Sequence, residues 1–285
     1  MDSNKTYEWG CWAMCGWALM ALMACSSEGS APGKAFHVVV ISMDGVQPSE
    51  ATPNLLQFAN TSTGFVDQAA AQGSPLAIAA TLLTGLTAAE HGAGTGPTND
   101  SPLSPEQTPL PEYLVDHGYQ TGTVISSGCG MPPESGLNQG FGEYLTIPGS
   151  ATDLALLAED WIESHRRQPF FLFVQFPVNA AEPLEKASAQ ADEGLGILLR
   201  KLADDGLLDA SLIVVTGNHG ETRMLRIKGP GQRAALSDPR QVLPEHMPQL
   251  LLRHMALPVA AVRPNSYFSY PLEPNTAEVA KDGNP

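Results

Sequence analysis

The chain has 285 residues, of which 30 are acidic and 15 are basic, so its formal net charge is -15 at pH 7. A chain of this length can bury a large core, and one α/β domain is enough to account for it. The negative charge argues against a nucleic-acid-binding protein, because an acidic surface repels phosphate.

The N-terminal region has the pattern of an exported protein. Residues 9–24 are apolar and uncharged, which is short for a membrane span and typical of an export signal. This segment ends in Leu-Met-Ala before Cys25, a sequence that resembles the lipobox of bacterial lipoproteins. We therefore expect a lipoprotein signal peptide at residues 1–24, lipidation at Cys25 and a flexible tether at residues 25–35. An ordinary signal peptide or a retained N-terminal anchor is the alternative, because no basic stretch precedes the apolar segment.

The cysteines do not form a disulfide framework. Cys11 and Cys15 lie in the signal segment, Cys25 is assigned to the lipid, and Cys129 is the cysteine of the folded part. No base or positive charge neighbours Cys129 in the sequence, so we expect a structural thiol and not a nucleophile.

Apolar, β-branched runs alternate with helical segments along the rest of the chain. Strands are expected at residues 36–43, 121–126, 170–176 and 212–216, and helices at residues 52–59, 77–86, 112–117, 153–165, 184–203 and 247–252. Thr52 is placed to cap the first helix. The alternation predicts a mainly parallel sheet with helices on both faces, and the polar residues 263–285 predict a loosely ordered tail.

Polar residues follow two of the expected strands. Asp44 comes after the first strand, and Asn218 and His219 come after the strand at residues 212–216. Ligands of open α/β sheets collect at the carboxyl ends of parallel strands, so we expect these three residues to lie together. The structural alternatives are an aspartate that caps a turn and a histidine that is hydrogen-bonded at a strand end.

Eight short segments, in this order, resemble the sulfatase family of the alkaline phosphatase superfamily over residues 36–258. They are Asp44, Thr52-Pro53-Asn54-Leu55, Leu82-Leu83-Thr84-Gly85-Leu86, His91-Gly92, Gly118-Tyr119-Gln120-Thr121, Gly136-Leu137-Asn138-Gln139-Gly140-Phe141, Pro169-Phe170-Phe171-Leu172 and Asn218-His219-Gly220-Glu221. The resemblance implies a three-layer alkaline-phosphatase-like α/β domain at residues 36–262, with the C-terminal subdomain of longer relatives missing. It also implies hydrolysis of a sulfate or phosphate ester, with a small ester of this kind or a glycan as the ligand.

The same resemblance implies a divalent metal, which would be calcium, magnesium or zinc. Asp44, Asn218 and His219 fall on the metal-ligand positions, although Asn218 replaces a carboxylate of the family. An amide oxygen can coordinate a hard cation but neutralises none of its charge. We therefore expect weaker metal binding than a full carboxylate set would give.

The nucleophile of the family has no counterpart in this chain. Counting back from the Leu-Thr-Gly segment puts Pro75 at that position, and aligning the motif proline instead puts Gly73 there. Neither residue can attack an ester. Ser74 lies between them as a weak catalytic candidate, and its structural alternative is the N-cap of a helix that begins at Pro75.

Other candidate side chains are assigned structural roles. His91 is expected to cap and turn the chain after the Leu-Thr-Gly helix. Arg223, Arg226 and Lys228 could bind an anion, but basic residues near a turn are usually solvated.

Two functions follow from these residues. The first is a catalytically impaired, sulfatase-like lipoprotein, a pseudoenzyme that is lipid-anchored to the membrane of the bacterial cell envelope and faces the periplasm or the cell surface. The alternative is an active metal-dependent sulfuric or phosphoric ester hydrolase that uses a rebuilt site. Neither function involves nucleic acid.

Overall fold

The computed structural model describes residues 36–65, 73–177, 183–217 and 223–259. These residues belong to one compact unit, Lys34–Pro285. The expected signal peptide, the tether with Cys25 and the tail at residues 263–285 lie outside the described residues.

A sheet of eight strands forms the centre of the described structure, in the order β4-β3-β5-β1-β6-β7-β2-β8. The strands are β1 (His37–Ser42), β2 (Thr63–Phe65), β3 (Gln120–Ser126), β4 (Glu143–Ile147), β5 (Phe170–Gln175), β6 (Ser211–Gly217), β7 (Met224–Lys228) and β8 (Leu236–Asp238). Neighbouring strands from β4 to β6 are all parallel, whereas β7 is antiparallel to both β6 and β2. The mainly parallel sheet expected from the sequence is confirmed.

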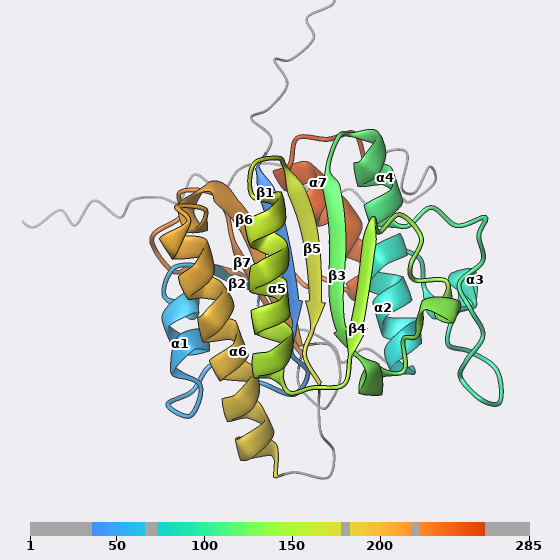
Figure 1. Ribbon diagram of the computed structural model, residues 1–285, viewed down its shortest axis with the longest axis horizontal. Helices are drawn as coiled ribbons and strands as arrows, with labels where there is room; N and C mark the ends of the chain where they lie inside the picture. The colour runs from blue at the N-terminus through green and yellow to red at the C-terminus, as the bar shows by residue number, and fades with distance from the viewer. Residues whose placement is uncertain (1–35, 66–72, 178–182, 218–222, 260–285) are drawn as a thin grey trace, which may run out of the picture. The chain divides into compact units, whose positions relative to one another are not determined.

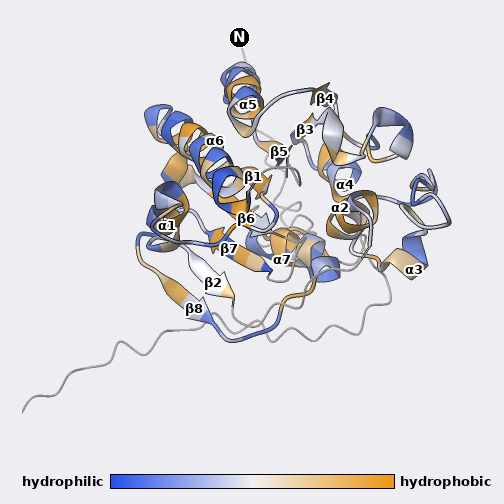
Figure 2. Cartoon of the chain, turned by 90° about the horizontal axis from the view of Figure 1, so that it is seen from below, coloured by the Kyte–Doolittle hydropathy of each residue, from blue (hydrophilic) through white to orange (hydrophobic). Residues whose placement is uncertain are grey.

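Helices cover both faces of this sheet (Figure 1). One face carries α1 (Pro53–Ala59), α5 (Ala151–His165) and α6 (Leu184–Asp204), and the other carries α2 (Pro75–Thr84), α4 (Leu110–Asp116) and α7 (Met247–His254). Figure 2 shows these two helical layers from the end of the sheet toward which β1, β5 and β6 run. The short helix α3 (Ala88–His91) follows α2. None of the described helices combines the length and apolar composition that spanning a bilayer requires.

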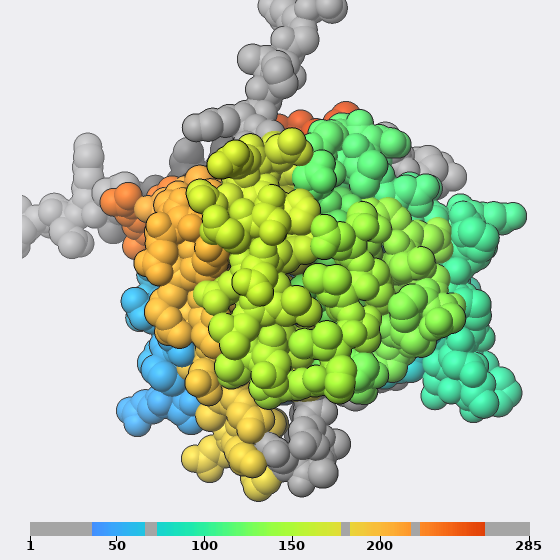
Figure 3. Space-filling view, viewed as in Figure 1, coloured from blue at the N-terminus to red at the C-terminus, as the bar shows by residue number. Residues whose placement is uncertain are grey.

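The core has two parts because strand side chains alternate between the faces. Val39 and Ile41 of β1 pack with α1, α5 and α6, while Val38 and Val40 pack with the helices of the opposite layer. Each strand of the sheet centre is therefore apolar along its length, as a sheet covered on both faces requires. Figure 3 shows the face on which α5 and α6 lie side by side.

The first helix begins as expected, but Thr52 does not cap it. Thr52 makes no capping hydrogen bond, and its hydroxyl group instead donates to the carbonyl of Gln47 at 2.7 Å. The carboxylate of Asp192 on α6 accepts hydrogen bonds from the backbone N–H groups of Asn54 at 3.0 Å and Leu55 at 2.7 Å. The expectation for Thr52 is wrong because the side chain of Asp192, which lies 138 residues after Asn54, takes the capping role.

Candidate functional site

Polar residues end the adjacent strands at the carboxyl edge of the sheet. Ser126 ends β3, Gln175 ends β5 and Ser42 ends β1, while Thr216 is the penultimate residue of β6. The strand register places Ser42 opposite both Gln175 and Thr216. All four residues are buried, with exposures of 5%, 6%, 1% and 0% in the order named. The sequence pattern alone does not identify this row as part of a site, although the apolar run of each strand changes to a polar residue at its end.

Asp44 lies at this edge, two residues beyond β1, and is half-buried. The Nε2 atom of Gln175 donates a hydrogen bond to Oδ2 of Asp44 at 3.3 Å. Gly217, at the end of β6, lies against it, because a Cβ atom built on Gly217 would be 3.8 Å from the Cα atom of Asp44. Gln175 therefore joins the candidate site as a residue that orients the carboxylate of Asp44.

The two strands that lead to the predicted metal ligands are neighbours. β1 pairs with β6 in parallel, so the chain leaves both strands at the same edge of the sheet. Asn218 and His219 directly follow β6 but lie outside the described residues. The closeness of Asp44 to these two side chains therefore stays a prediction.

The described residues alone do not provide a metal site. No group of three or more His, Cys, Asp or Glu side chains within residues 36–65, 73–177, 183–217 and 223–259 could hold a metal ion. Asp44 supplies one carboxylate, and the amide of Gln175 approaches it as a hydrogen-bond donor. The oxygen of Asn218 and the imidazole of His219 are the further ligands that the sequence predicts.

Cys129 lies near the same edge and is not set up as a nucleophile. Burial raises the pKa of its thiol to about 11, and the negative charge of Asp44 adds to this effect. Hydrogen bonds from Ser126 act in the opposite direction but are weaker. A thiol with so high a pKa is almost fully protonated at neutral pH, so the expected structural role of Cys129 is supported.

Ser74 is the N-cap of α2. Its Oγ atom donates a hydrogen bond to the carbonyl of Gly94 at 2.9 Å and accepts one from the backbone N–H group of Ala77 at 3.2 Å. Pro75 follows as the first residue of the helix. Both capacities of the hydroxyl group are therefore used in holding the start of the helix, which agrees with the structural alternative for this residue.

His91 is held in one neutral form. Its Nδ1 atom accepts a hydrogen bond from the backbone N–H group of Ala93 at 3.0 Å, and its Nε2 atom lies 3.0 Å from Oγ1 of Thr81. Thr81 donates its own proton to the carbonyl of Ala77, so Nε2 of His91 must be the donor in this pair. Burial also lowers the pKa of His91. The structure thus supports the structural role expected for this histidine.

The basic residues of β7 and the position before it are not solvated, which corrects the sequence-based expectation. Arg223 and Lys228 are only 7% and 3% exposed, and Arg226 is half-buried. Arg226 donates to the carbonyl of Ala59 at 3.3 Å, and Lys228 forms an ion pair with Asp209 at 3.1 Å. These side chains are buried or half-buried because other parts of the folded protein cover β7. The sequence of a basic segment near a turn does not show that it will be covered.

Solved structures with the same fold are known, although a scan against protein-family models finds no match. A protein of the alkaline phosphatase superfamily from Vibrio parahaemolyticus aligns with a TM-score of 0.65 and 16% identity, over 80% of this chain and 68% of the other. A sulfatase from Pseudoalteromonas sp. aligns with a TM-score of 0.63 and 15% identity, over 79% and 68%.

A third structure was solved with its substrate, D-glucosamine-2-N,6-O-disulfate. It aligns with a TM-score of 0.62 and 16% identity, over 79% of this chain and 77% of the other. Identities this low establish a shared architecture and leave the chemistry to the residues of the site. The chain therefore has the sulfatase-like fold of the alkaline phosphatase superfamily.

Proposed function

We propose that this protein is a sulfatase-like lipoprotein of the cell envelope, descended from metal-dependent sulfate or phosphate ester hydrolases and impaired in catalysis. The observation that carries the proposal is the start of α2. The family motif aligns its nucleophile with Gly73 or Pro75, and the hydroxyl group of Ser74 between them is used in the helix cap. Covalent catalysis requires an activated nucleophile, and these three residues do not provide one.

The ligand class follows from the fold and from the retained part of the site. One protein with this fold has a disulfated glucosamine as its substrate. Asp44 is retained beside a row of buried polar strand ends, so the edge of the sheet is polar even without the nucleophile. We infer that the protein binds a small sulfate or phosphate ester, or a glycan that carries one, at this edge.

A hydrolysis assay tests the impairment. The full chain is assayed with 4-nitrophenyl sulfate and 4-nitrophenyl phosphate in the presence of calcium, magnesium or zinc, beside a sulfatase that has its nucleophile. We expect kcat/KM to be lower than that of the control by at least about 10³-fold, because water attack must replace covalent attack. Rapid metal-dependent hydrolysis that is lost in Asp44→Ala would overturn the proposal of impaired catalysis and would support the alternative of an active hydrolase.

That alternative, an active ester hydrolase with a rebuilt site, has one observation in its favour. Asp44 and its partner Gln175 are held together by a hydrogen bond of 3.3 Å, so one carboxylate remains oriented at the carboxyl edge of the sheet. A metal held there by Asp44, Asn218 and His219 would polarise the ester.

Metal binding is tested separately from turnover. We expect Asn218→Asp to tighten calcium binding by about tenfold in calorimetric titration, because a carboxylate adds the charge that the amide lacks. The same variant should not gain hydrolysis while position 75 remains proline. Unchanged calcium affinity in Asn218→Asp would remove position 218 from the proposed metal ligands.

A further inference from the structure

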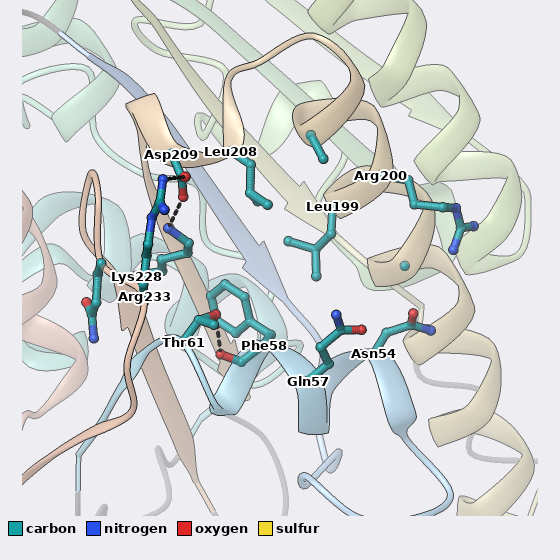
Figure 4. Close-up of a pocket in the computed structure, with 13 residues that line it drawn as sticks. Asn54, Gln57, Phe58, Thr61, Leu199, Arg200, Leu208, Asp209, Lys228 and Arg233 are labelled. Atoms are coloured by element: carbon teal, nitrogen blue, oxygen red, sulfur yellow. Dashed lines mark hydrogen bonds and ion pairs between the residues drawn. The ribbon is translucent and has the colours of Figure 1, made fainter.

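A pocket separate from the Asp44 edge lies between α1, α6 and the turn after β7, with a volume of about 270 Å³ (Figure 4). Lys228 in its wall pairs with Ile213 near the start of β6, whereas Asp44 lies beyond the opposite end of β1, next to Gly217. The pocket is therefore not part of the edge to which the proposed function assigns the ester.

The pocket has an apolar part and a charged end. Phe58 of α1, Leu199 of α6 and Leu208 line the apolar part, and Lys228, Asp209 and Arg233 form the charged end. Figure 4 shows Asp209 between the two cationic side chains and away from Leu199. Such a combination is typical of a site for a ligand with an apolar body and one charged group.

The charged end has one more positive than negative charge. The Nζ atom of Lys228 is 3.1 Å from Oδ1 of Asp209, and an Nη2 atom of Arg233 is 3.0 Å from Oδ2 of the same carboxylate. One carboxylate therefore serves two cations. In a protein whose net charge is -15, this local excess of positive charge favours an anion at this place.

Lys228 is the buried member of this group. Its side chain is 4% exposed, compared with 81% for Arg233. An ammonium group has three N–H donors, and among the described residues Asp209 is the hydrogen-bond partner of Lys228. A cation removed from water with donors to spare gains from a further anionic acceptor.

The walls of the charged end are held in place before any ligand binds. The backbone N–H group of Gly231 donates to the carbonyl of Asp209 at 2.9 Å, and that of Gly229 donates to Oε1 of Gln232 at 3.1 Å. The amide of Gln232 also donates to Oγ1 of Thr63 at 3.1 Å. These bonds fix the turn after β7 against its neighbours, which lowers the entropy cost of binding.

We propose that this pocket binds a small aromatic or cyclic monoanion, with its ring on Phe58, Leu199 and Leu208 and its anionic group on Lys228. The size agrees with this class, because an apolar cavity of about 150 Å³ holds benzene and the additional volume takes a carboxylate. Benzoate is the simplest probe of the site, and its dissociation constant is expected to be about 1 mM.

The test is titration of the full chain with benzoate at low salt, followed by ligand-observed NMR and calorimetry. Lys228→Met removes the charge and keeps an unbranched side chain, and should weaken binding about tenfold or more. Ala203→Trp places a large ring in the pocket from an exposed helical position and should abolish binding. The matched control is Lys201→Met on α6, the helix that also carries Ala203. The Nζ atom of Lys201 pairs with Glu163 and Asp205, which do not line the pocket.

Circular dichroism identifies any variant that fails to fold, and the remaining pocket variant then decides the outcome. Loss of benzoate binding in the folded pocket variants, with unchanged binding in Lys201→Met, supports the site. The proposal is overturned if benzoate shows no saturable binding up to about 20 mM, far above the expected dissociation constant. It is also overturned if binding persists unchanged in the folded pocket variants. Ester hydrolysis enters none of these measurements, so the result does not depend on the proposed function.

Discussion

Individual hydrogen bonds decide which polar side chains of this protein take part in structure. Ser74 uses its hydroxyl group to connect Gly94 with the first turn of α2, and His91 uses both ring nitrogens between Ala93 and Thr81. Asp44 differs, because Gln175, which donates a hydrogen bond to it, is itself a strand-end residue of the candidate site. Asp44 is therefore the residue on which a test of the candidate site should centre.

The reactivity of Cys129 reports on the surroundings of Asp44. A pKa of about 11 instead of 9.0 leaves about a hundredfold less thiolate at pH 8, so we expect slow alkylation by iodoacetamide in the folded protein. Asp44→Asn should raise the rate a few-fold, because it removes a negative charge that opposes ionisation. An unchanged rate in Asp44→Asn, measured by mass spectrometry, would argue against closeness of the two side chains.

The same shift predicts a pH dependence of stability. The pKa of Cys129 is higher in the folded than in the unfolded chain, so folding favours the neutral thiol. Its contribution is present below about pH 9 and is lost as the pH rises toward 11. Urea denaturation from pH 8 to 11 should show a smaller loss of stability for Cys129→Ala than for the unmodified protein. Parallel losses in the two proteins would contradict this prediction.

Substitution of Ser74 separates its capping role from a catalytic one. Ser74→Ala should lower the free energy of unfolding by about 1 kcal/mol, because α2 loses its N-cap. It should leave any measured hydrolysis rate unchanged. Ser104→Ala, which removes a weaker bond of 3.3 Å to the backbone of Glu106, is the matched control. A large loss of hydrolysis in folded Ser74→Ala would instead make Ser74 the nucleophile.

At the level of elements, α6 determines where α1 begins. The carboxylate of Asp192 caps α1 from a neighbouring helix, and the side-chain amide of Asn54 donates back to the carbonyl of Asp192 at 3.0 Å. Gly196 makes room for this contact, because a Cβ atom there would be 2.6 Å from Cγ of Asn54. The Thr-Pro-Asn-Leu segment thus has a packing role in this protein.

Removing this clamp should be costly. Asp192 is 2% exposed, so Asp192→Ala leaves the buried N–H group of Leu55 and the half-buried N–H group of Asn54 without their acceptor. We expect the free energy of unfolding to fall by about 2–4 kcal/mol in urea denaturation. Glu193→Ala, at the exposed neighbouring position, should change it by less than about 0.5 kcal/mol. Similar values for the two variants would show that the carboxylate of Asp192 is not the effective cap.

At the level of the whole molecule, the fold and the proposed membrane anchor belong to different parts of the chain. The described residues form a helix-covered sheet with the sulfatase-like fold. The proposed anchor at Cys25 lies outside them. The acidic composition, with a net charge of -15, does not favour adsorption to an anionic membrane, so membrane association would depend on the lipid.

Lipidation is tested by expressing the full chain in bacteria with radioactive palmitate. We expect the unmodified protein to be labelled and to sediment with membranes, because a Leu-Met-Ala-Cys sequence ends the apolar segment. Cys25→Ser should lose the label and the processing, whereas Cys129→Ser should keep both. Equal processing and sedimentation of Cys25→Ser and the unmodified protein would reject the lipoprotein proposal.

The sequence by itself determined the alternation of strands and helices, because buried parallel strands are apolar throughout and leave long uninterrupted runs such as residues 170–176. It also placed Asp44 and the segment after β6 at one edge, since parallel neighbours end together. It did not predict β2, β4, β7 or β8. β2 and β8 have three residues each, which is too short for a periodic signal. Only the tertiary structure decided that Asp192 caps α1, that Gln175 contacts Asp44 and that Lys228 is buried beside Asp209. Each of these contacts joins residues distant along the chain, and local patterns carry no information about such pairs.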